Sequence, residues 1–152
     1  MPKIDRERVE LVSGTGYPSP YDSPCRAREW HPLGDAAGLT QFGVNLVRLK
    51  PGVWSSQRHW HAEEDEFVYV LEGTLVLVTD EGRQTMASGD CAGFKAGVRD
   101  GHHLINESSE DAVFLVVGSR KEGDWGEYPD IDMKFVRGRR TEFQTKDGKE
   151  LP

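Results

Sequence analysis

Four of the five histidines stand in two close pairs, His59/His61 and His102/His103. Residues i and i+2 of a β-strand point to the same side, about 6–7 Å apart along the strand. The imidazoles of His59 and His61 can therefore lean toward one point and bind a metal ion at about 2.1 Å. The second pair can add a third imidazole. These residue types and spacings indicate a metal site.

A carboxylate lies close to the first histidine pair in the sequence. Glu66 follows His61 by five residues, and the polar segment 62–65 between them predicts a turn. After the turn Glu66 can return on the next strand, where it shares parity with Val68 and Val70. An inward-facing carboxylate needs a cation or a hydrogen-bonding partner. Glu66 is therefore a candidate ligand, with Asp65 as the alternative if the turn is shorter.

The segments that would position these side chains have the length of strands. In residues 41–49 apolar and polar residues alternate, which is typical of a half-buried strand. The 17 glycines and 8 prolines break the chain into short runs, and no window has a convincing helical period. This pattern predicts a β-sandwich or small barrel, with helix limited to short turns. The other predicted elements are strands 67–71 and 74–79 joined by a turn at 72–73, a hairpin tip at 80–82 and a buried strand at 112–118.

Residues 52–73, GVWSSQRHWHAEEDEFVYVLEG, resemble the first motif of the cupin superfamily, G-x5-H-x-H-x3–4-E-x6-G. His59, His61, Glu66 and Gly73 fit the motif. One departure is that six residues rather than five separate Gly52 from His59.

Residues 89–106, GDCAGFKAGVRDGHHLIN, resemble the second cupin motif, G-x5-P-x-G-x2-H-x3-N. Lys95 stands where proline is usual, and the loop before the histidine is longer than in the motif. Counting back from Asn106 selects His102 as the ligand. His103 is the competing choice and would face the opposite way on a regular strand. The motif positions that fit are Gly89, Gly97 and Asn106.

The resemblance implies an all-β fold, a single cupin barrel (a double-stranded β-helix or jelly roll) with irregular arms. We expect an N-terminal arm at 1–39, the barrel at 40–118 and a C-terminal extension at 119–152, packed on the barrel or on a partner subunit. Residues 13–38 are rich in glycine and proline, whereas the C-terminal extension holds many large apolar residues. This apolar content, and an exposed edge strand expected near 41–49, favour a homodimer.

The resemblance and the inward parity of Glu66 predict one divalent transition metal ion bound by His59, His61, Glu66 and His102. Nitrogen and oxygen donors suit Fe, Mn, Ni, Co or Zn, and the sequence does not choose among them. Four protein ligands leave coordination positions open, which is typical of a working site. Cys91 lies inside the second motif, and we interpret it as a small core residue rather than a ligand.

An open metal site allows three functions. The ion can act as a Lewis acid on a small, polar, carbohydrate-like molecule, as in an isomerase. It can serve an Fe(II)-dependent dioxygenase, or the barrel can bind or sense a small ligand without catalysis. The arms are similar to those of small bacterial cupins, some of which carry sugar-phosphate isomerase labels. Candidates for a general acid or base are Glu64, Asp100 and Tyr69, although residues 63–65 are most simply a solvated turn.

The charge excludes some partners. The formal net charge of −7 argues against binding to a nucleic acid, because nothing would neutralise the phosphates. No stretch approaches the roughly 20 apolar residues of a membrane span, and the first residues lack the apolar region of a secretory signal. Two cysteines are too few for a disulfide framework. We therefore expect a cytoplasmic protein that binds a small molecule.

Overall fold

The fold is built almost entirely from β-strands. We describe residues 2–152 of a computed structural model of the chain. Within them helix is limited to α1 (Leu33–Ala36) and two 3-10 turns, η1 (Arg6–Arg8) and η2 (Ser23–Cys25). None of the described helices is long and apolar enough to cross a bilayer. The prediction of a strand-rich barrel is confirmed. The sequence has no helical hydrophobic period, and this is the physical reason for the small helix content.

The larger sheet forms one wall of the barrel. All of its neighbouring strands are antiparallel. The longest pairing joins its two central strands, from Ala112 opposite Leu49 to Ser119 opposite Phe42. In spatial order the strands are β1 (Val12–Ser13), β2 (Glu29–Pro32), β3 (Phe42–Leu49), β10 (Ala112–Ser119), β5 (Glu66–Glu72) and β8 (Cys91–Phe94).

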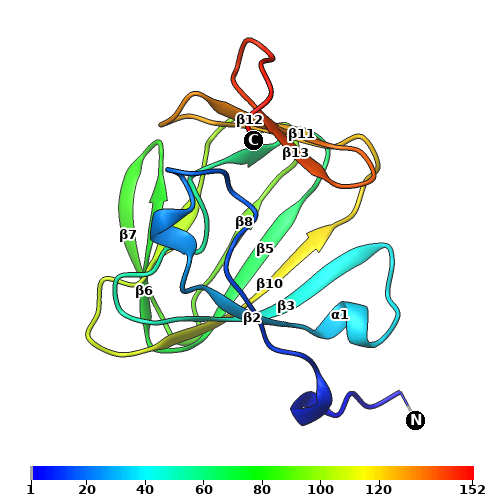
Figure 1. The fold of residues 1–152 in the computed structure, drawn as a ribbon. Helices are drawn as coiled ribbons and strands as arrows, with labels where there is room; N and C mark the ends of the chain where they lie inside the picture. The colour runs from blue at the N-terminus through cyan, green and yellow to red at the C-terminus, as the bar shows by residue number, and fades with distance from the viewer. Residues whose placement is uncertain (1) are drawn as a thin grey trace.

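Two smaller sheets complete the barrel. Figure 1 shows β6 and β7 on the side opposite the larger sheet, and β11, β12 and β13 lying together across one end. One sheet consists of β7 (Gly82–Ala87), β6 (Thr74–Thr79) and β9 (His103–Ile105). The other consists of β13 (Thr141–Gln144), β12 (Met133–Arg137), β11 (Trp125–Tyr128) and β4 (Trp60–His61).

The turn expected at residues 72–73 is a crossover between sheets. β5 pairs with β8 and β10, whereas β6 pairs with β7 and β9. Gly73 has a φ of 75°, and a Cβ there would lie 2.6 Å from the carbonyl oxygen of Asp111. Only glycine tolerates both conditions. The chain therefore bends from one sheet into the other, while the hairpin expected at 80–82 forms as predicted, with Thr79 opposite Gly82.

The main hydrophobic core lies between the larger sheet and the β7-β6-β9 sheet. Alternate residues of β5, Val68 and Val70, are buried, as the parity of that strand predicts. Burying each such side chain contributes about 1.5–3 kcal/mol. The buried cluster comprises Val47, Leu49, Val53, Val68, Val70, Leu75, Leu77, Met86, Leu104, Ala112 and Phe114.

The N-terminal arm is more regular than expected. Its strand β2 pairs with β3 from Arg48 to Asn45, so β3 lies between two strands. The expectation of an exposed edge strand at residues 41–49 was therefore wrong. The backbone groups of β3 find partners in a segment whose strand pattern is too short to stand out among the surrounding glycines and prolines.

The C-terminal extension covers one end of the barrel. β11 pairs with β4 through Gly126 opposite His61. A Cβ on Gly126 would overlap the carbonyl of Trp60 and the ring of Phe135, so glycine permits this close pairing. Behind it the buried side chains of Tyr128, Met133 and Phe135 form a second apolar cluster. The extension thus brings its own residues against a histidine of the first motif.

Cys91 is exposed, contrary to the expectation that it is a small core residue. It stands opposite Tyr69, which is also exposed, and both face the outside of the larger sheet. The position in the second motif did not reveal the side chain's direction, because that depends on the register of β8 against β5.

Candidate metal centre

Four side chains from different elements meet inside the barrel. His61 belongs to β4, and His59 precedes it by two residues, as expected for a shared face. His59 forms an isolated antiparallel bridge with His102, which lies just before β9. Glu66 is the first residue of β5. The curvature of the barrel lets these separate strands point their side chains at one place.

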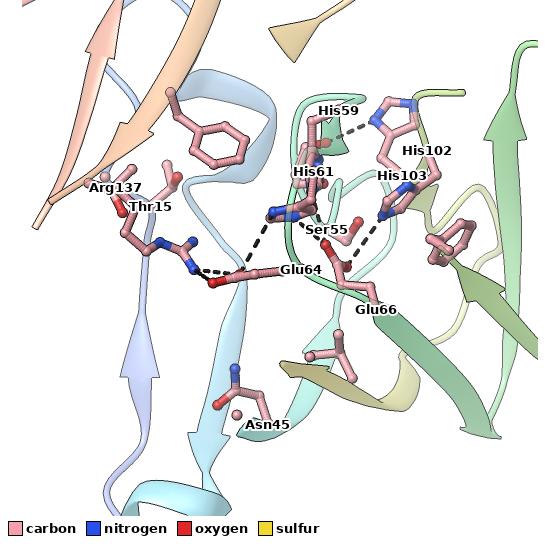
Figure 2. Close-up of a pocket in the computed structure, with 18 of the residues that line it drawn as sticks. Thr15, Asn45, Ser55, His59, His61, Glu64, Glu66, His102, His103 and Arg137 are labelled. Carbon is pink, nitrogen blue, oxygen red and sulfur yellow. Dashed lines mark hydrogen bonds and ion pairs between the residues drawn. The ribbon is translucent and has the colours of Figure 1, made fainter. Parts of the chain in front are cut away.

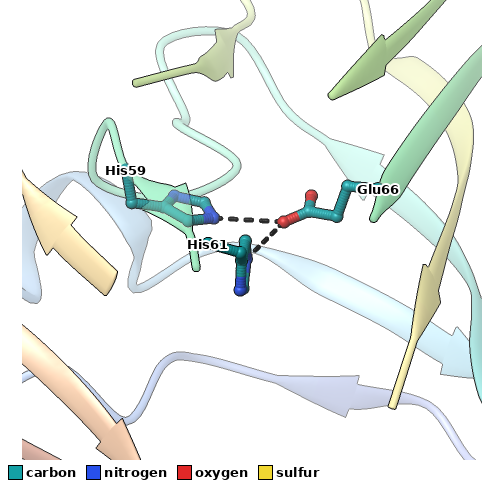
Figure 3. A group of neighbouring side chains, drawn as sticks. All are labelled: His59, His61 and Glu66. Carbon is teal, nitrogen blue, oxygen red and sulfur yellow. Dashed lines mark hydrogen bonds and ion pairs between the residues drawn. The ribbon is translucent and has the colours of Figure 1, made fainter. Parts of the chain in front are cut away.

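The carboxylate of Glu66 lies among the three imidazoles (Figure 3 draws two of them). Its Oε1 is 2.5 Å from Nε2 of His61 and 3.3 Å from Nε2 of His59. Its Oε2 is 3.3 Å from Nε2 of His102. Neighbouring donors of an octahedral ion with bonds of about 2.1 Å are about 3 Å apart. The donors of His59, His61 and Glu66, all within 4.8 Å of one another, form a group able to hold a metal ion.

The outer nitrogens of two imidazoles are held by hydrogen bonds. Nδ1 of His59 is 2.8 Å from the carbonyl oxygen of Gln57, to which it donates. Nδ1 of His61 donates to Oδ2 of Asp124 at 2.7 Å. Such bonds fix the ring orientation and leave Nε2 as the coordinating atom in a neutral imidazole. Both histidines are therefore oriented as metal ligands are.

The two adjacent histidines of the second motif face different ways. His102 stacks on Phe94, with ring centroids 3.6 Å apart and an interplanar angle of 5°, and presents Nε2 to Glu66. Its Nδ1 is buried without a hydrogen-bonding partner. His103 instead donates from Nδ1 to the carbonyl oxygen of Ser56 at 2.8 Å and packs edge-on against Trp54. The ring that reaches the Glu66 carboxylate is thus that of His102.

Burial and charge act in opposite directions on these groups. Burial opposes ionisation of Glu66, but the hydrogen bonds from His102, His59 and His61 outweigh it and hold the pKa of Glu66 well below its ordinary value. Burial also disfavours the charged form of His61, yet Asp124 and Glu66 together raise the pKa of His61 to about 9. Burial prevails for His102, whose pKa is lowered. Without a metal ion, the proton on His61 supplies the positive charge that Glu66 requires.

A second buried carboxylate lies on the other side of His61. Glu64 is 5% exposed, so the expectation of a solvated turn at residues 63–65 was wrong for this residue. Nη1 of Arg137 donates to both of its oxygens at 2.6 and 2.7 Å, and the backbone N–H of Lys121 donates to Oε2 at 2.9 Å. The C-terminal extension supplies both donors. A carboxylate with its own cation can be buried at a tolerable cost.

Asp124 is the functional residue that sequence reasoning missed. Its side chain is fully buried and accepts from His61 through Oδ2 and from the backbone N–H of Glu63 through Oδ1 at 2.8 Å. These bonds outweigh the effect of burial and lower the pKa of Asp124. Asp124 lies 63 positions from His61 and outside both motifs, so no local spacing signals it.

The four side chains line a cavity of about 870 Å³ (Figure 2), a size typical of small-molecule sites. Tyr17 and Tyr128 also line it, with the ring of Tyr128 5.8 Å from that of His59. Burial raises the pKa of Tyr17 to about 12 and that of Tyr128 well above its ordinary value. Both phenols are therefore protonated at neutral pH, and because they hydrogen-bond to each other, one O–H of the pair is free to donate.

The candidates for a general acid or base lie in different surroundings. Tyr69 is 39% exposed and points away from the barrel interior. Asp100 accepts a hydrogen bond from the backbone of Asp80 at 2.7 Å and lines a smaller pocket rather than the main cavity. Glu64 lines the main cavity, with both oxygens bonded to Arg137. Of the three, Glu64 alone lines the main cavity with the histidines, and there Arg137 binds both of its oxygens.

Comparisons with known proteins agree with this architecture. The family model described as a cupin domain matches residues 45–118. The crystal structure of a sugar phosphate isomerase from a cupin superfamily, from Silicibacter pomeroyi DSS-3, is 46% identical, with a TM-score of 0.95. The match covers 99% of this chain and 96% of that chain. A comparison with curated protein sequences gives no significant match.

Two further structures show how widely this fold is used. A "putative sugar phosphate isomerase" from Acidithiobacillus ferrooxidans ATCC 23270 is 32% identical, with a TM-score of 0.74, covering 80% of this chain and 78% of that one. The polyketide cyclase RemF from Streptomyces resistomycificus shares the fold at 21% identity and a TM-score of 0.63, covering 80% of each chain. The fold alone therefore does not decide the reaction.

A jelly-roll barrel that gathers three imidazoles and a carboxylate around an internal cavity defines a class of small-molecule-binding β-proteins. The chain belongs to the cupin superfamily.

Proposed function

We propose that this cupin is a metal-dependent enzyme that acts on a small, carbohydrate-like molecule by isomerase-type proton transfer. The observation that carries the proposal is the convergence of three Nε2 atoms on the Glu66 carboxylate within a large cavity. The names of the two relatives above 30% identity support sugar phosphates as the substrate class.

The proposed ligands of one divalent ion (Fe, Mn, Ni, Co or Zn) are His59, His61, Glu66 and His102. Their donor atoms suit such ions, and the buried carboxylate among imidazoles has no lysine or arginine within ion-pairing distance in residues 2–152. When bound, the ion would supply Lewis acidity that polarises a substrate carbonyl. The unpartnered Nδ1 of His102 leaves that ring the least constrained of the three by hydrogen bonds.

The chain's own residues would position the substrate. Tyr17 and Tyr128 lie on the cavity wall with their protonated hydroxyls hydrogen-bonded to each other, which leaves one O–H of the pair to donate to a substrate oxygen. Glu64 and Arg137 form an ion pair beside His61 on the wall of the cavity.

Metal analysis after anaerobic reconstitution tests the centre. The parent protein should retain about one equivalent of ion, His102→Ala should lose it, and His103→Ala should retain it. The two variants form a matched pair because both rings are buried and adjacent. Loss in His103→Ala alone would move the third imidazole to His103. Failure of the parent to bind any of the five metals would overturn the proposal.

The reaction is tested with aldose and ketose phosphates in deuterated water. An isomerase that moves a proton should incorporate solvent deuterium at a carbon next to the carbonyl, detected by NMR. Oxygen consumption by the iron-loaded protein with sugar acids, diketones or phenols would instead support a dioxygenase. Tight binding of a sugar phosphate without exchange or turnover would support a sensing role.

We also propose that the chain forms a homodimer, with the barrel at 40–118, arms at 1–39 and 119–152, and a cytoplasmic location. Phe67, Tyr69 and Leu71 are each about two-fifths exposed on the outer side of β5. They form an uncharged row on a chain of net charge −7, where two copies can approach with little repulsion. Sedimentation should give a dimer that Tyr69→Glu dissociates, and a monomeric parent would contradict the dimer.

A further inference from the structure

One cationic side chain of the main cavity has no acidic partner. Arg120, Lys121 and Arg137 also line this cavity, and they form ion pairs with Asp35, Glu63 and Glu64 respectively. Arg28 lines the same cavity, yet no carboxylate within residues 2–152 lies at ion-pairing distance from it. Carboxylates thus balance the charges of the other three cations, whereas the positive charge of the Arg28 guanidinium has no such partner within residues 2–152.

The contacts of Arg28 hold its side chain in place but use few of its hydrogen-bond donors. Its Nη1 donates to the carbonyl oxygen of Ser55 at 2.9 Å, and its Cζ lies 4.4 Å from the centroid of the Trp30 ring. Its Nε is buried and has no hydrogen-bonding partner. A guanidinium offers five N–H donors in a plane, which match two oxygens of a carboxylate or phosphate. Most of these donors have no acceptor in the chain.

The ionisable groups that act on Arg28 are neutral at pH 7. Burial lowers the pKa of Arg28, and the ionisable groups that act on it are Tyr17, Cys25 and Tyr128. Burial in turn raises the pKa of Tyr17 to about 12 and that of Cys25 to about 11. These groups are neutral at pH 7, whereas arginine stays charged in proteins. An uncompensated charge of this kind is costly unless a ligand supplies the opposite charge.

Arg28 is connected to the proposed metal centre by short contacts. It bonds to Ser55, and the next residue, Ser56, has its hydroxyl 3.4 Å from Nδ1 of His59. Figure 2 shows Ser55 on the cavity wall behind His61 and Glu66. Because Arg28 and the proposed metal ligands line the same cavity, a ligand bound there can contact both.

We propose that Arg28 is the anion-binding residue of the cavity and takes an oxyanion of the ligand, a phosphate or a carboxylate. The inference deepens the proposed function, on which it depends for the role of the cavity as a substrate site. Arg28 would hold the charged end of the molecule while the reacting carbonyl lies at the Glu66 cluster. Neutral sugars would then bind much more weakly than their phosphates or acids.

The test uses chelator-treated protein, so that no metal ion can bind the anion. Inorganic phosphate and acetate are titrated separately by calorimetry into the parent, Arg28→Met and Arg120→Met. Arg120→Met is the matched control, because Arg120 lines the same cavity but already pairs with Asp35. We expect Arg28→Met to weaken binding of the preferred anion at least tenfold and Arg120→Met to change it less than threefold. Phosphate binding without acetate binding identifies a phosphate ester, and the reverse identifies a carboxylate.

Thermal unfolding separates this role from a structural one. Without added anions, Arg28→Met should melt no lower than the parent, because it removes an unpaired buried charge. The preferred anion should raise the Tm of the parent but not that of Arg28→Met. Arg28→Lys keeps the charge but loses the planar donor edge, and should bind the anion three- to tenfold more weakly than the parent.

Three results would overturn the proposal: a parent that binds neither anion, an Arg28→Met variant that binds as tightly as the parent, or poor folding of both Arg28 variants. Since the assay contains no metal and measures no turnover, none of these results bears on the metal analysis of the His102→Ala and His103→Ala variants.

Discussion

His61 lies between two carboxylates inside the barrel, Glu66 and Glu64, whose charges are balanced in different ways. On its inner side Glu66 faces three imidazoles, and its ion pairs within residues 2–152 are all with histidine. On its outer side Glu64 is paired with Arg137 through both oxygens. Asp124 also lies on this side and binds Nδ1 of His61.

The different charge partners of Glu64 and Glu66 show which of the two carboxylates has a structural role. At Glu64 the chain supplies a permanent cation, so the charge is balanced without any ligand. At Glu66 the balance depends on a proton on His61, which a divalent ion can displace. A group that relies on an exchangeable cation is suited to binding one. On the outer side Asp124, not Glu64, fixes the orientation of the His61 ring that would bind the ion.

The proposed difference between the two glutamates is tested most directly by replacing each of them in turn with the neutral glutamine. Glu66→Gln should lower metal affinity at least about 100-fold, because the substitution removes the one anionic donor among the proposed ligands. The measurement is metal content after dialysis, with circular dichroism to show that the barrel stays folded.

Glu64→Gln is the matched control for this prediction, since it makes the same change on the other side of His61. It should retain about one equivalent of metal. Equal metal loss in the two variants would contradict the assignment of separate roles.

Asp124→Asn should have an intermediate effect. The amide keeps the shape but not the charge that holds Nδ1 of His61, and loss of such an outer partner typically weakens metal affinity about 10–100-fold. Competition with a chromophoric chelator would measure the change. An affinity equal to that of the parent would show that the His61–Asp124 bond does not support the centre.

Arg137→Met should have the smallest effect on the metal and a clear effect on stability. It leaves Glu64 buried with one backbone donor and no cation, which should lower the free energy of unfolding by about 2 kcal/mol. Metal affinity should change less than threefold. Urea unfolding of the chelator-treated protein checks the first value, and chelator competition checks the second.

A companion variant tests the cause of that instability. Glu64→Gln/Arg137→Met removes both charges, so it should recover part of the stability lost in Arg137→Met. If the double variant were as unstable as the sum of the two single variants, the two groups would not be coupled.

Sequence alone predicted four strands of the barrel, β3, β5, β6 and β10, and the side chains on the inner side of His61, but not the strands of the two arms. The strands follow from local alternation, and β6 begins and ends at the predicted residues. The cluster of His59, His61 and Glu66 follows from spacing within one short segment, and parity on β5 placed the half-buried Glu66 on the same side of the strand as the buried Val68 and Val70.

The direction of Cys91 and the pairing of β3 could not be predicted in the same way. Both depend on which strand lies alongside, and residues far away in the sequence decide that. Local patterns identify strands but not their neighbours.

The amino-acid sequence by itself determined the strand-rich class, the cupin motifs and the residues that could meet a metal ion, because each depends on spacing over a few positions. Tertiary structure alone decided the groups that act on that centre from a distance. Asp124 and Arg137 come from the C-terminal extension and Arg28 from the N-terminal arm. Their roles arise because chain folding brings charges together, or leaves one unpaired, across separations that no local pattern records.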